Sequence, residues 1–132
     1  MHATPYVSLF AAFLLIYAPR LVVAREQARQ PEGYDNAHPR AQQAKLTGLG
    51  LRAQGAHMNG FEVFAPFAAG VLACGLRQID PARVDALCIA FLVARLVYVG
   101  LYLGNLATLR STVWTLGFLA VCGLLGSAAW GG

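Results

Sequence analysis

Four long apolar stretches divide the chain, and a polar segment separates each from the next. They cover residues 5–23, 56–76, 84–106 and 112–130. A bilayer core of about 30 Å needs roughly 20 apolar residues in a helix that rises about 1.5 Å per residue. No stretch alternates apolar and polar residues as a barrel strand does, and each is long enough for a helix. The pattern predicts a single domain, residues 1–132, that is an all-α integral membrane four-helix bundle.

The polar segments predict how the four spans are connected. The first connector, 24–55, contains proline, glycine and asparagine over residues 30–40, which is typical of a loop. Residues 41–54 favour helix, so the second helix is expected to begin before it enters the membrane. The other two connectors are short, and short connectors make consecutive helices antiparallel neighbours.

Composition and charge agree with a membrane protein. Of the residues, 58% are hydrophobic and only 12% are charged. Val22 and Ala24 resemble the small residues before a signal-peptide cleavage site, but no positive charge precedes the apolar run and arginines follow it. We therefore interpret the first span as a retained helix. The cysteines, Cys74, Cys88 and Cys122, show no paired spacing that would indicate a metal site or a disulfide framework.

The distribution of Lys and Arg predicts the orientation. The first connector and the third share one side and hold seven of them: Arg20, Arg25, Arg29, Arg40, Lys45, Arg52 and Arg110. The other side holds only Arg77 and Arg83. The positive-inside rule then places the first connector in the cytoplasm and both termini on the non-cytoplasmic side. Because the positive charge follows one membrane face and lacks interleaved aromatic residues, it indicates topology and no nucleic-acid partner.

Two ionisable residues lie inside apolar spans, where such groups are rare and mark functional-site hypotheses. Glu62 lies about 9 Å and Arg95 about 16 Å from the cytoplasmic ends of their spans, at about 1.5 Å per residue. A long arginine side chain can bridge that offset. We expect an ion pair between them, within one subunit or across an interface. A pair that only fixes the helix register is an equal alternative to a ligand-binding role.

Helical spacing groups further polar residues with these two. Arg52 and Asn59 share a face with the intramembrane glutamate, because separations of seven and three residues return to nearly the same direction. Tyr98 and Tyr102 share the face of the intramembrane arginine in the same way, although tyrosines near a membrane interface are also common anchors.

The start of the fourth span offers a second kind of polar group. Arg110 and Ser111 bring a cation, a hydroxyl and helix-terminal backbone N–H groups together, which suits an anionic ligand or a thiolate. A simple positive-inside anchor is the alternative for Arg110.

Several of these residues fall within segments that resemble a known family. Residues 56–62, Ala-His-Met-Asn-Gly-Phe-Glu, followed by Pro66-Phe67, resemble the second-helix signature of the MAPEG family, the membrane-associated proteins of eicosanoid and glutathione metabolism. The third helix is similar through Ala94-Arg95, Tyr98, Tyr102, Leu103-Gly104 and then 109–111. The resemblance covers essentially the whole chain, and residues 34–40 with the short length are similar to the bacterial members.

This resemblance implies a homotrimer whose ligand sites lie between neighbouring subunits, open to the cytoplasm and the lipid, in a bacterial inner membrane. In catalytic relatives glutathione binds there, and an arginine or a nearby hydroxyl stabilises its thiolate for attack on a lipophilic electrophile or peroxide. Arg110 is the expected catalytic residue. The expected glutathione-binding residues are Arg52, Asn59, Glu62, Arg95, Tyr98, Tyr102 and Ser111.

Two departures from the family pattern keep an alternative open. Gly55 stands where catalytic eicosanoid members carry an arginine, and Trp114 stands where several carry a tyrosine. Both favour a non-catalytic MAPEG protein that binds a lipid or another hydrophobic ligand. Arg110, Asn59 and Glu62 together favour the leading prediction, a membrane-bound glutathione-dependent transferase or peroxidase that acts on lipophilic electrophiles. A small proton-coupled drug exporter is a third possibility, but such exporters usually place a glutamate in the first helix, and span 5–23 contains no acidic residue.

Overall fold

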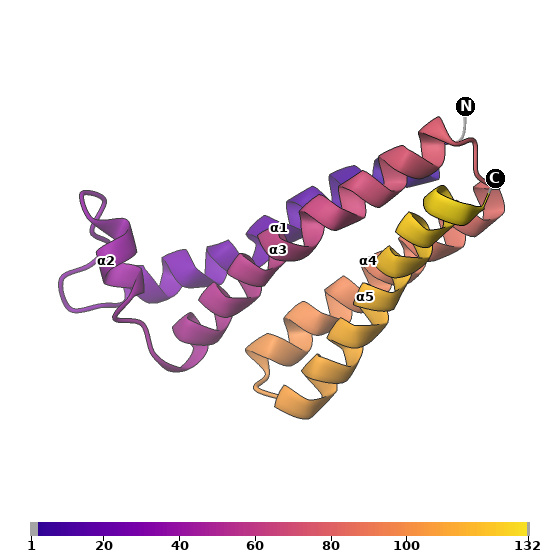
Figure 1. Ribbon diagram of the computed structural model, residues 1–132. Coiled ribbons are helices and arrows are strands. Elements are labelled where there is room, and N and C mark those ends of the chain that lie inside the picture. Colours follow the sequence, from indigo (N-terminus) through magenta and orange to yellow (C-terminus); the bar gives the residue numbers. More distant parts are fainter. Residues whose placement is uncertain (1–2, 132) are drawn as a thin grey trace.

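Four long helices and one short helix form the computed structural model, which describes residues 3–131 (Figure 1). The helices are α1 (Thr4–Ala28), α2 (Pro39–Gln43), α3 (Gly48–Leu76), α4 (Pro81–Leu103) and α5 (Ala107–Trp130). All but α2 are long and apolar enough to cross a membrane. The predicted all-α architecture with four spanning helices is therefore confirmed.

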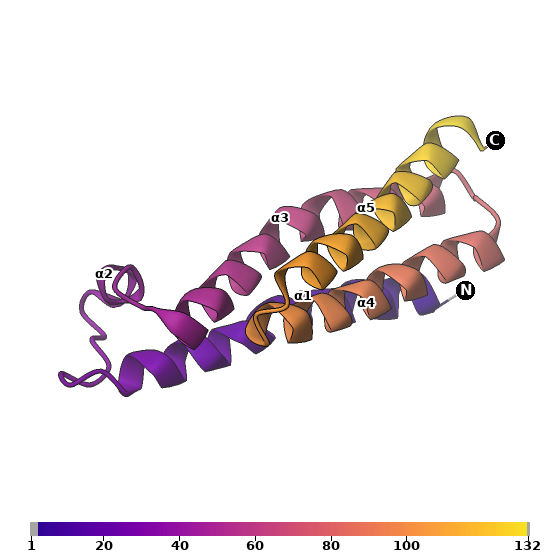
Figure 2. The ribbon, with the colours of Figure 1, turned by 90° about the horizontal axis from the view of Figure 1, so that it is seen from below.

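The long helices pack as two antiparallel pairs. α1 packs mainly against α3 and α4 mainly against α5, while α3 also contacts both α4 and α5. Both chain ends lie beside the α3–α4 turn, and α2 lies at the opposite end (Figure 1). Figure 2 shows that α1 and α3 also extend past the α4–α5 turn at the α2 end. The two termini therefore share one end of the bundle, as the four-span topology requires.

The α4–α5 turn is shorter than the apolar pattern indicates. α4 ends at Leu103, and α5 begins at Ala107, five residues before the expected start at 112. Asn105 adopts a left-handed backbone conformation with φ 61°, which asparagine tolerates better than most residues. Because α5 begins early, the backbone N–H of Arg110 already donates to the Leu106 carbonyl, at 2.9 Å. That N–H is not available to a ligand, contrary to the expectation for a helix start there.

The apolar core lies mainly between α3, α4 and α5, and Ala12 of α1 also belongs to it. Phe67 of α3 and Phe91 of α4 are both buried and stack with ring centroids 3.9 Å apart. The buried thiol of Cys74 donates to the Leu124 carbonyl of α5 at 3.2 Å. A smaller buried cluster of Val23, Leu46 and Ala53 joins α1 to the start of α3. The core holds the three helices in a fixed register.

Two buried glutamines hold the first connector against the end of α1. Gln27 is fully buried, and its amide nitrogen donates to the Pro39 carbonyl at 3.0 Å and to Gln42 Oε1 at 3.1 Å. Its oxygen accepts from Arg20 at 3.0 Å. Gln42 also accepts from the Asp35 backbone N–H at 3.1 Å. The segment that the sequence predicts as loop is thus fixed by side-chain hydrogen bonds.

Asp35 shapes the tip of this connector. Its Oδ1 accepts from the backbone N–H groups of Ala37 and His38, each at 2.9 Å. The hydrogen bond from the His38 backbone N–H is the main reason that the pKa of the Asp35 carboxyl lies below its usual value. The ionised carboxylate is therefore the form that stabilises this turn.

Candidate functional site

Two adjoining cavities lie along α3, α4 and α5. The first, called here the polar cavity, has a volume of about 280 Å³ and is lined by Asn59, Tyr98, Tyr102, Arg110, Ser111, Trp114 and Thr115. The second, called here the apolar cavity, has a volume of about 240 Å³. Three polar side chains line it, Asn59, Glu62 and Arg95. The rest of its wall is mostly apolar and consists of Val63, Pro66, Phe91, Trp114, Gly117, Phe118, Val121, Cys122 and Leu125. Asn59 and Trp114 line both, so the cavities form one amphipathic cleft.

Asn59 connects the two intramembrane ionisable residues. Arg95 Nη1 donates to Asn59 Oδ1 at 3.0 Å, and Asn59 Nδ2 donates to Glu62 Oε2 at 2.8 Å. Within the described residues no direct ion pair joins Arg95 to Glu62, so the expected contact is wrong as a contact within one subunit. The physical reason is that an amide offers both an acceptor and a donor, and its position one turn before Glu62 places it between the two charges.

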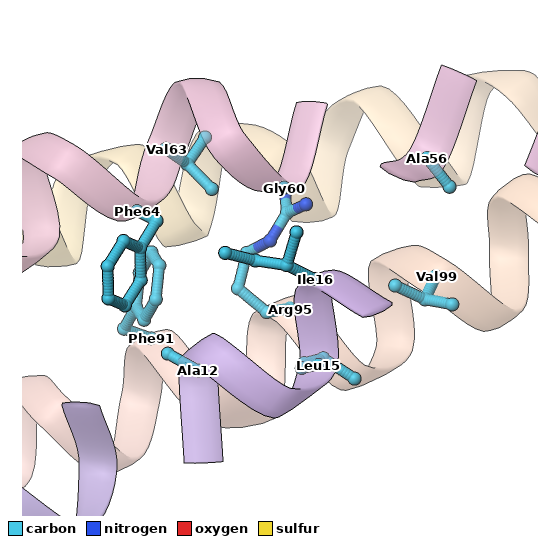
Figure 3. A pocket seen from close by; sticks show the side chains of 10 residues that line it. All are labelled: Ala12, Leu15, Ile16, Ala56, Gly60, Val63, Phe64, Phe91, Arg95 and Val99. Carbon is cyan, nitrogen blue, oxygen red and sulfur yellow. The ribbon is translucent and has the colours of Figure 1, made fainter. Parts of the chain in front are cut away.

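Arg95 is only 5% exposed, although it carries a charge inside an apolar span. Figure 3 shows its side chain reaching from α4 toward Gly60 of α3, in a pocket that Phe91 and Ile16 also line. Its Cζ also lies 4.1 Å from the ring centroid of Tyr98. A guanidinium removed from water needs such partners. Arg95 is therefore held by protein groups on two sides.

Stacking contacts continue from Arg95 to the polar cavity. Tyr98 and Tyr102 meet edge to face with ring centroids 5.6 Å apart. The Arg110 guanidinium then lies over Tyr102, with its Cζ 4.4 Å from the ring centroid. Along the cleft, two tyrosine rings in contact with each other thus lie between the guanidinium groups of Arg95 and Arg110.

Arg110 differs from Arg95 in what its N–H groups contact. Among the described residues the Arg110 guanidinium makes no hydrogen bond or ion pair, and its one specific contact is the face of Tyr102. A guanidinium has five N–H donors in its plane. Because the stacking uses only the face, those donors remain free for an anionic group in the polar cavity.

Ser111 and Arg52 each make a hydrogen bond within the chain. Ser111 Oγ donates to the Ala107 carbonyl at 3.1 Å, so the hydroxyl proton is not available to a ligand. Arg52 Nε donates to the Leu103 carbonyl at the end of α4, at 3.1 Å, where the helix dipole favours a cation. Arg52 lines neither cavity. The structure thus brings together all the expected site residues except Arg52.

A sequence model of the MAPEG family matches residues 4–130, which include all four spanning helices and the connector. The chain belongs to the MAPEG family. No curated protein and no solved structure matches it.

The histidine of the MAPEG signature has a structural role in this chain. His57 Nδ1 lies 2.7 Å from the Ile16 carbonyl, and because a carbonyl only accepts, Nδ1 carries the proton. Its ring also packs against Tyr17 and Phe61 on the outer side of α1 and α3. His57 lines neither cavity, so in this MAPEG chain it joins α3 to α1.

From the sequence, Trp114 was noted only as a departure from the family pattern, and its partner, Phe118, was passed over. Trp114 and Phe118 stack nearly parallel, with ring centroids 5.4 Å apart and planes at 7°, and both line the apolar cavity. Their separation of four residues on one helix was the signal that could have found them. In this MAPEG chain they form the aromatic wall of the cleft.

Proposed function

We propose that this MAPEG protein is a glutathione-dependent transferase or peroxidase that acts on lipophilic electrophiles. The observation that carries the proposal is the Arg110 guanidinium, which Tyr102 holds at the polar cavity with its N–H donors free. The adjoining apolar cavity gives a hydrophobic electrophile a place beside the thiol. A polar and an apolar cavity that share two residues suit a reaction between a hydrophilic thiol and a lipophilic partner.

Arg110 is the proposed catalytic residue because a thiol needs help to ionise. A free thiol has a pKa of about 8.5 and is mostly protonated at neutral pH, whereas a neighbouring guanidinium favours the thiolate. In the transferase reaction the thiolate sulfur forms a bond to the electrophilic carbon, and the leaving group departs with the bonding electrons. In the peroxidase reaction two glutathione molecules reduce one hydroperoxide to an alcohol and water, and they leave as the disulfide.

The charges of the cleft match part of glutathione, which carries two carboxylates and one ammonium. Glu62 is exposed and can accept the ammonium, and Arg110 can bind an anionic group. Arg95 is only 5% exposed and donates to Asn59, and Arg52 lines neither cavity. The polar cavity of one subunit therefore offers one cation, Arg110, for two carboxylates and a thiolate.

This shortage supports a site completed by a neighbouring subunit, and we extend the proposal to a homotrimer with ligand sites between subunits. Glu62 lies on the surface of a single subunit within an apolar span, where contact with lipid tails would be costly. A neighbouring copy would cover it. With the positive-inside count, the proposal places α2 and the polar cavity on the cytoplasmic side of a bacterial inner membrane, and both termini on the other side.

A second candidate function is non-catalytic binding of a lipid or another hydrophobic ligand. The wall formed by Trp114 and Phe118 favours it, because stacked aromatic rings suit an apolar chain. Gly55 favours it too, because this residue brings no side chain to bind a carboxylate.

A titration of the purified protein with glutathione in detergent separates the two functions. For the enzyme we expect binding at millimolar glutathione or below, a rise in thiolate absorbance and conjugation of a generic aryl halide. A glutathione analogue that lacks the sulfur is the control, and it should bind without the absorbance change. Absence of binding at millimolar glutathione would rule out the enzyme and leave the lipid binder.

A further inference from the structure

Gly55 gives α3 a recess at the point where Tyr102 of α4 meets it. A Cβ atom added at residue 55 would overlap the Tyr102 hydroxyl and would lie 2.8 Å from Tyr102 Cζ, a distance that real Cβ atoms essentially never show. A glycine inside a helix costs about 1 kcal/mol relative to alanine. The phenol of Tyr102 occupies its present place because residue 55 has no side chain.

The position of Tyr102 in turn determines the position of Arg110. The Tyr102 ring face is the one specific partner of the Arg110 guanidinium among the described residues. Arg110 is also the one arginine among the residues that line the polar cavity. A shift of the ring would therefore move the cation that any anionic group in this cavity meets.

We propose that Gly55 is a positioning residue, which seats Tyr102 against α3 so that Tyr102 holds Arg110 at the polar cavity. The positioning itself requires no particular ligand. Only its consequence for a bound thiolate rests on the proposed function above.

Helix packing alone is the competing explanation for Gly55, because small residues let membrane helices approach closely. The hydrogen bond from Arg52 to the Leu103 carbonyl already joins the same two helices one turn away. If Gly55 served packing alone, its replacement would disturb the whole junction, and the environment of Arg110 would change no more than that of other groups nearby.

Tryptophan quenching by an anion tests the proposal without glutathione. The chain has two tryptophans, and in a Trp130→Phe background Trp114 is the single emitter, in the same cavity as Arg110. Iodide is attracted by a nearby cation, whereas acrylamide is neutral. We expect Arg110→Ala to reduce the iodide quenching constant about twofold and to leave the acrylamide constant unchanged. Gly55→Ala should reproduce most of this difference.

Gly100→Ala is the matched control, because Gly100 also lies inside a helix and a Cβ there would meet nothing within 4 Å. It should leave both quenching constants unchanged. Tyr102→Phe added to Gly55→Ala removes the phenol oxygen that the new Cβ meets first, so part of the iodide quenching should return. Absence of that recovery would mean that the new Cβ does not act through the Tyr102 hydroxyl.

Two results would overturn the proposal. One is a Gly55→Ala protein that iodide quenches as strongly as the parent, and the other is an equal change in the iodide and acrylamide constants.

Should Gly55→Ala fail to fold, Tyr102→Leu tests the same link without a clash, and unchanged iodide quenching there would refute it. If glutathione binds, Gly55→Ala should also raise the pKa of the bound thiol, and Gly100→Ala should not. Because quenching needs no glutathione, its result is independent of the proposed function.

Discussion

The first connector and the cleft both gather polar side chains, but they differ in whether those groups are satisfied. At the connector, Gln27 and Gln42 are neutral, buried and hydrogen-bonded within the chain. In the cleft, Arg110 is charged, and its N–H groups contact no acceptor among the described residues. A buried polar group with complete hydrogen bonds stabilises a fold, whereas a positioned charge with free donors is available to a ligand.

The three arginines near the cleft show the same contrast on a smaller scale. Arg52 donates to the Leu103 carbonyl, and Arg95 donates to Asn59. Arg110 alone of the three rests only on an aromatic face. The three arginines thus differ in the contacts of their guanidinium groups, although their residue type is the same.

Replacement of Arg110 by alanine should give the largest effect and should fall on activity alone. We expect conjugation activity to decrease about 100-fold, because the thiolate loses its nearby cation. The unfolding temperature should hardly change, since no hydrogen bond from the side chain is lost. Arg83→Ala, at the opposite end of the bundle, is the control and should keep both properties. Comparable loss of activity in both variants would contradict the assignment.

Replacement of Gln27 by alanine should have the opposite effect, a loss of stability with activity unchanged. It removes the donor to Pro39 and Gln42 and the acceptor for Arg20, and we expect a loss of about 2 kcal/mol in the free energy of unfolding. Activity per folded molecule should remain. Thermal unfolding in detergent measures the first and conjugation assays the second. Gln43→Ala is the matched control, because Gln43 has the same side chain, lies in α2 beside Gln42, and makes no side-chain hydrogen bond among the described residues. Equal destabilisation by the two would show that the amide network contributes little.

The smallest effect should come from the pH dependence of the connector tip. The Asp35 pKa is lower in the folded protein than in the unfolded chain, where it is about 3.9. The carboxylate therefore stabilises the turn above about pH 4, and this contribution is lost as the pH falls through the lower, folded pKa. Hydrogen exchange at the Ala37 and His38 amides, corrected for intrinsic rates, should accelerate on acidification. In Asp35→Asn the acceptor oxygen remains but does not titrate, so the corrected rates should not depend on pH.

Much of this arrangement was accessible from hydrophobic periodicity. Four apolar stretches predict the four spanning helices, and helical spacing places Asn59 with Glu62 and Tyr98 with Arg95. Those relations lie within single helices, so the period of 3.6 residues determines them. The same reasoning predicted that the polar faces of α3 and α4 lie opposite each other.

The individual contacts between helices could not be predicted from the sequence. The amide of Asn59 between Arg95 and Glu62, and the seat of Tyr102 against Gly55, depend on how far α3 and α4 slide along each other. Side-chain packing over the whole interface sets that register, and no local spacing records it. The early start of α5 was missed for a different reason, because Thr108, Arg110 and Ser111 interrupt its first residues, which lie outside the apolar stretch.

The separation of the cleft into two cavities bears on how such a protein can diversify. Apart from Asn59 and Trp114, no residue within 3–131 lines both cavities. Phe118, Cys122 and Leu125 can thus vary to admit longer or bulkier hydrocarbon without altering Arg110 or Tyr102. Selection can then change which apolar groups fit at one end of the cleft while the charged and aromatic groups at the other end stay the same.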